Sequence, residues 1–209
     1  MGLAITPSGE VCGATVTGVD LAGPLATEAV TQIRAAWLEH HVLAFPEQTM
    51  TDDDLERFSV CFGPFGDDPF IAPIAGRDHV IAIRRRADET APLFAENWHT
   101  DWSFQARPPA GTCLYGITIP PHGGDTLFAD QHAAFDAMPQ SLRARLAGRQ
   151  AVHSARGGYA RRCLDDGSAP GRINGHRGRL TLLCPGARHH AGVIGTRARG
   201  ETGQQHDSP

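Results

Sequence analysis

The segment from Asn97 to Phe104 constrains the possible fold and chemistry of this chain more than any other segment, because it carries a histidine and a carboxylate two residues apart. We predict that this segment is a strand. Side chains of a strand alternate between its two faces, so His99 and Asp101 would point the same way, roughly 6–7 Å apart along the strand. An imidazole and a carboxylate in this relation supply two of the three protein ligands of a 2-His-1-carboxylate site, which leaves positions open on Fe(II). The third ligand would be a histidine from elsewhere in the chain.

Two further motifs follow this segment. Pro108 to Gly111 reads Pro-Pro-Ala-Gly and predicts a turn, and Gly123 to Phe128 reads Gly-Gly-Asp-Thr-Leu-Phe. Together with Trp-His-x-Asp, in this order and at this spacing, they resemble the signature of the TauD/TfdA-like family. Its members are Fe(II)- and 2-oxoglutarate-dependent dioxygenases of the taurine dioxygenase type. The resemblance covers residues 3–154.

The resemblance implies a fold, two cofactors and three binding residues. The fold is mainly β with flanking helices, a double-stranded β-helix (jelly roll) that is incomplete at its C-terminus in this chain. His99 and Asp101 would bind Fe(II), and Thr126 would help to bind the far carboxylate of 2-oxoglutarate as co-substrate. The partners implied are O₂ and a small, anionic organic substrate that is hydroxylated. No side chain is assigned a catalytic role of its own.

The neighbours of the two metal ligands are candidates for substrate contacts. Asn97 falls on the ligand face by the period of two and would hydrogen-bond the substrate or a ligand, and we expect Phe104 to wall the substrate cavity. An ordinary core position is the alternative for Phe104. Trp102 falls on the opposite face, where we expect it to pack in the core. The taurine enzymes carry a histidine for the sulfonate in the loop that matches 66–73, and this loop contains none, which argues against taurine.

The remaining pattern predicts one domain of alternating strands and helices. With 209 residues the chain has room for one sizeable core. Thr27, Thr51 and Asp130 are expected as helix N-caps, and turn residues delimit the other elements. We predict helices over about 27–40, 51–62, 130–138 and 139–147, and strands within 3–20 and over about 40–46, 80–83, 97–104, 111–119 and 150–154.

Charge and cysteine usage exclude several classes of partner. The net charge of −4 argues against nucleic acid or a membrane surface as the main partner, because either calls for a basic patch. The five cysteines are widely spaced without a C-x-x-C pair, so neither a disulfide framework nor a zinc knuckle is indicated. The N-terminus lacks a cationic and apolar leader, and we expect a cytoplasmic protein. A homo-oligomer is compatible with the sequence.

The composition changes after residue 154. Residues 155–209 hold 9 of the 19 cationic residues, all of them arginine, 11 of the 24 glycines and only 4 of the 23 acidic residues. All nine Phe and all three Trp precede this tail, so it has few large side chains to bury. We therefore expect an N-terminal part of a dioxygenase domain over 1–154 and an atypical, irregular Arg/Gly-rich tail over 155–209, with Arg179 to Leu183 as its one ordered stretch.

The tail motivates a hypothesis about the integrity of the chain. In the family, the later part of the sequence supplies the second metal histidine and an arginine for 2-oxoglutarate, and we find no matching motif in the tail. We hypothesise that the chain is a truncated or frame-changed, impaired copy. Two alternatives stay open: a non-catalytic jelly-roll remnant, and a Zn-dependent hydrolase that uses His99 and Asp101.

Overall fold

The computed structural model describes residues 2–68, 70–84, 99–119, 126–153, 178–181 and 192–197. It divides into two compact units. Unit 1 comprises Met1–Gly63, Ala110–Met138 and Gly192–Pro209, and unit 2 comprises Pro64–Pro109 and Pro139–Ala191. Within the described ranges, no helix has the length and apolar character that a membrane span requires.

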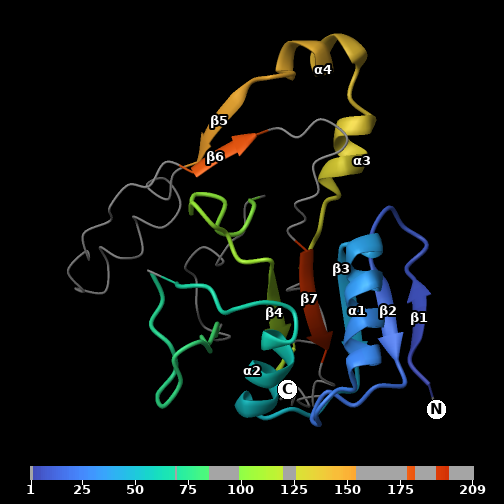
Figure 1. Cartoon of the computed structure of the whole chain (residues 1–209), viewed down its shortest axis with the longest axis vertical. Coiled ribbons are helices and arrows are strands. Elements are labelled where there is room, and N and C mark those ends of the chain that lie inside the picture. The colour runs from blue at the N-terminus through green and yellow to red at the C-terminus, as the bar shows by residue number, and fades with distance from the viewer. Residues whose placement is uncertain are drawn as a thin grey trace, which may run out of the picture. The chain divides into compact units, whose positions relative to one another are not determined.

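Unit 1 is built on a five-stranded mixed sheet with the order β1-β2-β3-β7-β4 (Figure 1). Its strands are β1 (Ala4–Pro7), β2 (Ala14–Thr17), β3 (Val42–Pro46), β4 (Gly111–Tyr115) and β7 (Gly192–Arg197). The pair β1 and β2 is antiparallel, as the turn pattern within 3–20 predicts, whereas β2, β3, β7 and β4 run parallel to their neighbours. Parallel neighbours need a crossover, and α1 (Thr27–His40) supplies the one between β2 and β3.

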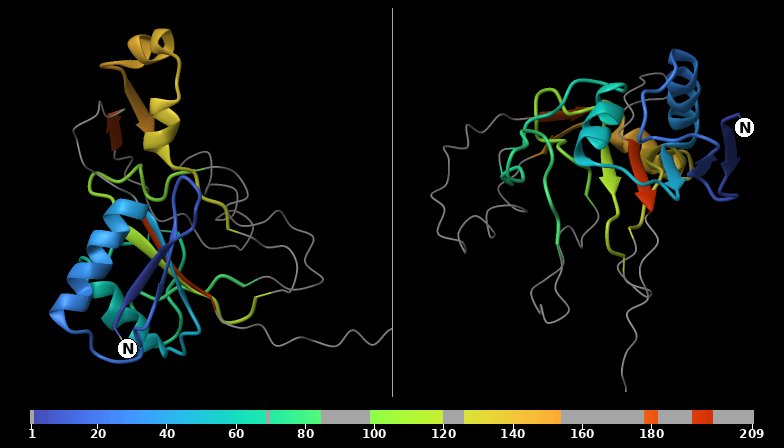
Figure 2. Two further views of the ribbon diagram at one scale, coloured as in Figure 1. Left: turned by 90° about the vertical axis from the view of Figure 1, so that its right-hand side faces the viewer. Right: turned by 90° about the horizontal axis from the view of Figure 1, so that it is seen from below.

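The core of unit 1 lies between this sheet and two helices, α1 and α2 (Asp52–Val60), which cover the same face of it (Figure 2). Val16 of β2 and Leu43 and Phe45 of β3 alternate with less buried residues and are 0% exposed. They meet Ile33 of α1, also 0% exposed, and Phe58 of α2, whose ring lies edge-on to Phe45 at 5.5 Å. Burying such side chains contributes about 1.5–3 kcal/mol each, so this layer is the main source of stability in the unit.

The start of α2 agrees with the N-cap predicted from the sequence, whereas the start of α1 does not. α2 begins as predicted, because the Thr51 hydroxyl accepts a hydrogen bond from the Asp54 N–H at 3.2 Å and Asp54 Oδ2 accepts from the Thr51 N–H at 2.8 Å. The predicted cap of α1 is wrong: Thr27 is already helical and the cap position is Ala26, which makes no side-chain hydrogen bond. α1 forms without that bond because its inner face is buried in the core.

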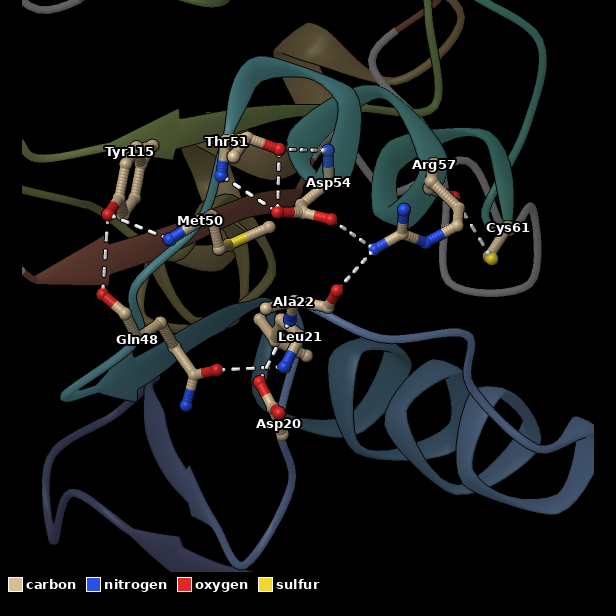
Figure 3. A network of polar contacts seen from close by, with 10 residues as sticks. All are labelled: Asp20, Leu21, Ala22, Gln48, Met50, Thr51, Asp54, Arg57, Cys61 and Tyr115. Atoms are coloured by element: carbon tan, nitrogen blue, oxygen red, sulfur yellow. Dashed lines mark hydrogen bonds and ion pairs between the residues drawn. The ribbon is translucent and has the colours of Figure 1, made fainter.

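A polar network ties the turn after β3 to the rest of unit 1 (Figure 3). The Gln48 side chain accepts from the Leu21 N–H at 2.9 Å and donates to the carbonyls of Val19 and Pro46, both at 3.1 Å. The Tyr115 hydroxyl of β4 accepts from the Met50 N–H at 3.0 Å. These bonds satisfy backbone groups that would otherwise be left without a partner inside the fold.

Unit 2 contains the two-stranded antiparallel sheet of β5 (Gln150–His153) and β6 (Gly178–Thr181), together with α4 (Gln140–Leu146). Two predicted strands are not strands here. Residues 80–83 are irregular, and residues 101–104 form a turn. Trp102 in this turn has φ 53°, a backbone conformation that a strand does not contain. Asn97, the first residue of the predicted strand, lies outside the described residues.

The tail contains more regular structure than its composition predicts. β6 overlaps the predicted stretch at 179–183, but β7 was not predicted and pairs along its length with both β3 and β4. A strand between two partner strands forms backbone hydrogen bonds on both of its edges. These hydrogen bonds can order a segment that has few large apolar side chains, so its composition does not predict the strand. The five strands of unit 1, three pairs of them parallel, also differ from the antiparallel sheets of a jelly roll.

Candidate metal centre

His99 and Asp101 lie together in unit 2, at the beginning of the turn over 101–104. The His99 Nε2 atom is 3.0 Å from Asp101 Oδ1. The turn itself is held by local hydrogen bonds, from the Gln105 N–H to the Trp102 carbonyl at 2.9 Å and from the Ser103 hydroxyl to the Thr100 carbonyl at 3.3 Å. The side chains converge because the backbone turns, and not because they share one face of a strand.

The two side chains remain accessible to solvent. The exposed fraction is 44% for the His99 side chain and 36% for the Asp101 side chain. An imidazole nitrogen and a carboxylate oxygen are donors that suit divalent iron. Two donors bound to one ion at right angles, each about 2.1 Å from it, lie about 3.0 Å apart. The separation of the pair agrees with two adjacent positions on a metal ion, and it is equally the length of a direct hydrogen bond between the two groups.

The structure describes no complete set of metal ligands. No group of three or more His, Cys, Asp or Glu side chains arranged to hold a metal occurs among the residues described. His99 and Asp101 can thus supply two of the three ligands that a 2-His-1-carboxylate site needs. A ligand from outside the described ranges is required to complete it.

Three aromatic rings from unit 2 contact each other next to this pair. The Phe70 ring lies nearly parallel to Trp102 at 6.4 Å, and the Phe104 ring lies at an angle to both, with 5.7 Å between centroids in each case. All three side chains are half-buried. Trp102 and Phe104 are two residues apart, and their rings contact each other within the turn. We refer to Phe70, Trp102 and Phe104 as the aromatic cluster.

The loop that carries Phe70 is fixed by polar contacts. Asp68 Oδ1 accepts from the N–H groups of Phe70 at 2.8 Å and Ile71 at 3.0 Å, and the Gln105 amide donates to the Asp67 carbonyl at 2.9 Å. Phe70 is not among the site residues predicted from the sequence. The signal that could have found it is a single aromatic residue within a loop otherwise rich in Gly, Asp and Pro, since such loops seldom expose a large ring without a contact.

The other predicted site residues are placed as follows. Thr126 lies in unit 1, on the stretch between β4 and α3 (Gln131–Asp136), and its side chain is exposed. Phe104 lies in the aromatic cluster beside the donor pair. Asn97 is outside the described residues. The structure thus brings together His99 and Asp101, and it places the Phe104 ring against Phe70 and Trp102.

Comparison with known proteins identifies relatives along most of the chain. The family model described as taurine catabolism dioxygenase TauD, TfdA family matches residues 4–202, well beyond the 3–154 that the motifs cover. A curated relative is the (S)-phenoxypropionate/alpha-ketoglutarate-dioxygenase of Delftia acidovorans, which is 35% identical over 166 residues. The match covers 73% of this chain and 54% of the relative.

Two solved structures resemble the fold. A taurine dioxygenase from Burkholderia xenovorans matches with a TM-score of 0.59 and 32% identity over 72% of this chain and 53% of its own. AAD-2 in complex with Mn(II) and N-oxalylglycine matches with a TM-score of 0.56 and 26% identity over 79% of this chain and 57% of its own. The chain spans about half the length of the relatives it matches.

Proposed function

This chain belongs to the TauD/TfdA family of dioxygenases, and we propose that it is an Fe(II)- and 2-oxoglutarate-dependent dioxygenase that hydroxylates a small, anionic organic substrate. The family match over residues 4–202 supports the class of reaction. The observation that carries the proposal for this chain is the 3.0 Å approach of His99 Nε2 and Asp101 Oδ1 at a solvent-accessible turn. A relative that depends on alpha-ketoglutarate supports the co-substrate.

His99 and Asp101 would hold Fe(II) through one nitrogen and one oxygen, and a further histidine would complete the set of ligands. Iron bound in this way, together with 2-oxoglutarate and O₂, supplies the oxidising power to hydroxylate an unactivated C–H bond. The solved relative that contains Mn(II) and N-oxalylglycine supports a metal beside a 2-oxoglutarate-like ligand in this family.

Thr126 is proposed to bind the far carboxylate of 2-oxoglutarate through its hydroxyl group. Its exposed position in unit 1 leaves that hydroxyl available to a ligand. We also propose that the complete fold is a jelly roll, even though three pairs of neighbouring strands in the described sheet of unit 1 are parallel. The similarity to solved dioxygenases supports this architecture.

The aromatic cluster is proposed to bind the apolar part of the substrate. Trp102 and Phe104 follow Asp101 within three positions of the sequence, and Trp102 lies in the same turn, which supports a role for these rings beside the metal centre. Half-buried aromatic rings offer flat apolar surface to a ligand. The relative from Delftia acidovorans, named for phenoxypropionate, supports a substrate that has both an apolar ring and an anionic group. Asn97 is proposed to hydrogen-bond the substrate.

We also propose that this chain turns over poorly, because no second metal histidine and no arginine for 2-oxoglutarate is identified in its tail. The charge reversal after residue 154 supports an origin by truncation or by a change of reading frame. The family match to residue 202 limits such a change to the last part of the tail or to short stretches within it. Reading the underlying DNA in all frames tests the origin: the idea fails if no other frame contains a histidine and arginine segment.

Anaerobic titration with Fe(II) and 2-oxoglutarate tests the proposed metal centre. We expect a metal-to-ligand charge-transfer absorption band, which His99→Ala and Asp101→Ala each abolish. The chain offers a matched control in Asp78→Asn and His79→Gln, an adjacent pair of the same residue types on exposed positions of unit 2. These controls should leave the band unchanged. Hydrolysis that depends on Zn²⁺ would favour a hydrolase instead, and absence of any metal binding would favour a non-catalytic remnant.

A further inference from the structure

Within unit 2, the loop over residues 64–71 lies against the segment over residues 102–109. Three contacts join them: Gly66 with Pro109, Asp67 with Gln105, and Phe70 with both Phe104 and Trp102. Along the loop, the partners come in the reverse order of the chain, so the two segments run in opposite directions. The contacts therefore define one register between the loop and the segment that follows the metal-binding pair.

Gly66 allows the two segments to approach closely. A Cβ atom at this position would lie 3.2 Å from Cβ and 3.4 Å from Cγ of Pro109. Carbon atoms that are not bonded to each other are most stable at about 3.5–4.0 Å, so a side chain at residue 66 would push the loop away. The proline ring is closed on the backbone and cannot rotate to avoid such a contact. The absence of a side chain at Gly66 therefore sets one end of the register.

Gln105 connects the loop to the turn that carries His99 and Asp101. Its backbone N–H donates to the Trp102 carbonyl at 2.9 Å and closes this turn. Its side-chain Nε2 donates to the Asp67 carbonyl at 2.9 Å, although the two residues are 38 positions apart in the sequence. One residue thus shapes the turn with its backbone and holds the loop with its side chain.

Apolar burial contributes little to the position of this loop. Among the described residues of 64–84 and 99–109, none is buried, whereas unit 1 has a core of completely buried side chains. The Asp68 carboxylate orders the loop internally through the N–H groups of Phe70 and Ile71. Hydrogen bonds and ring contacts between the two segments therefore carry more of the positioning here than they do in unit 1.

We propose that Gly66 and Gln105 are positioning residues, which fix the register of the loop and thereby hold the Phe70 ring in the aromatic cluster. The consequence for the substrate rests on the function proposed above. The space beside the cluster for the apolar part of a substrate depends on where the Phe70 ring lies. A flat aromatic ring is the kind of group that such a surface selects.

NMR spectroscopy of the Trp102 indole signals tests the positioning in protein without iron or 2-oxoglutarate. The Phe70 ring lies nearly parallel to the indole, so its ring current shifts these signals. Trp102→Phe assigns them, and Phe70→Leu gives the values expected when the Phe70 ring is absent. Gln105→Met keeps the length of the side chain but removes the donor. It should move the signals from the wild-type values toward those of Phe70→Leu.

Matched variants separate the register from general effects of substitution. Gln105→Lys restores a donor that can reach the loop and should return the signals toward the wild-type values. Gln140→Met, at an exposed position of unit 2, should leave them unchanged. Gly66→Ala should displace them, whereas Gly63→Ala should not, because a Cβ at residue 63 would lie at an ordinary 3.9 Å from Ala110 Cβ.

A binding measurement addresses the consequence for the substrate. In protein supplied with Fe(II) and 2-oxoglutarate, phenoxypropionate serves as the probe for the aromatic cluster. Gln105→Met should raise the Kd for this probe about fivefold, as expected for the loss of one hydrogen bond, without changing the affinity for Fe(II). Gln105→Lys should recover most of the affinity for the probe.

Two results would overturn the positioning: Trp102 signals in Gln105→Met and Gly66→Ala that equal those of the wild type, or equal displacement in Gln140→Met and Gly63→Ala. An unchanged Kd in Gln105→Met would overturn the consequence for the substrate. Displaced Trp102 signals, together with no binding of phenoxypropionate to any variant or to the wild type, would support the positioning and count against the proposed function alone.

Discussion

The core of unit 1 and the turn over residues 99–105 are stabilised in different ways. In the core, Val16, Leu43 and Phe45 are completely buried between the sheet and two helices. At the turn, the side chains of His99 and Asp101 are 44% and 36% exposed. Burial of apolar side chains contributes most of the stability and does not depend on the exact direction of each side chain. Two atoms that bind one metal ion, by contrast, need a defined separation. Stability and binding capacity therefore belong to different residues of this chain.

The largest expected change in stability comes from the core. Phe45→Ala removes a completely buried ring that contacts Phe58, and we expect it to lower the free energy of unfolding by about 3–5 kcal/mol. Chemical denaturation measures this loss. Phe128→Ala, at a position that is 40% exposed, is the control and should cost less than about 1 kcal/mol. Equal losses in the two variants would break the contrast between buried and exposed positions.

A smaller loss is expected at the start of α2. Thr51→Ala removes the hydroxyl that caps the helix and should cost about 1 kcal/mol of unfolding free energy. Thr51→Ser keeps a capping hydroxyl, so it should retain most of the stability. A thermal unfolding series of the three proteins measures the difference. A serine variant as unstable as the alanine variant would show that the methyl group, and not the cap, is responsible.

Acid should weaken the same helix start. The hydrogen bonds from Thr51, assisted by Arg57, lower the pKa of Asp54 from its ordinary value of 3.8 to about 2. Because the folded state lowers this pKa, the stabilisation is complete above pH 3.8 and is lost as the pH falls through about 2. Asp54→Asn should flatten the dependence of stability on pH in this range. Asp52→Asn, a change in the same helical turn, should leave it intact.

The smallest change in stability is expected at the donor pair, where the effect on binding is largest. His99→Ala in protein without metal should alter the free energy of unfolding by less than about 0.5 kcal/mol, because the imidazole is largely exposed. The same variant should lose Fe(II) binding. Parallel denaturation and metal titration measure both quantities. A large loss of stability here would show that the turn contributes to the fold as the core does.

The sequence predicts much of unit 1 because its signals are local. The capping box at Thr51 and the apolar spacing of α1 place two helices, and both are observed. The cap at Asp130 likewise predicts the start of α3, where its carboxylate accepts two backbone hydrogen bonds. These predictions hold in the folded protein because the interacting groups are within four residues of each other and need no distant segment to form.

Pairing between distant segments could not be predicted in the same way. β7 lies between β3 and β4, more than 75 residues from either in sequence, and its own composition does not indicate a strand between two partners. Trp102 illustrates the same limit over a short range. Its positive φ belongs to a turn where a strand was predicted, and its ring contacts Phe104 and, from another loop, Phe70.

The amino-acid sequence by itself determined the donor types and their order: an imidazole and a carboxylate two residues apart, within motifs that identify the family. Only the tertiary structure decided how these groups meet. The donor atoms of His99 and Asp101 converge through a turn, and Phe70 from a separate loop joins the rings beside them. The reason is physical: a residue's chemistry is encoded at its own position, whereas its direction depends on backbone angles that neighbouring segments select.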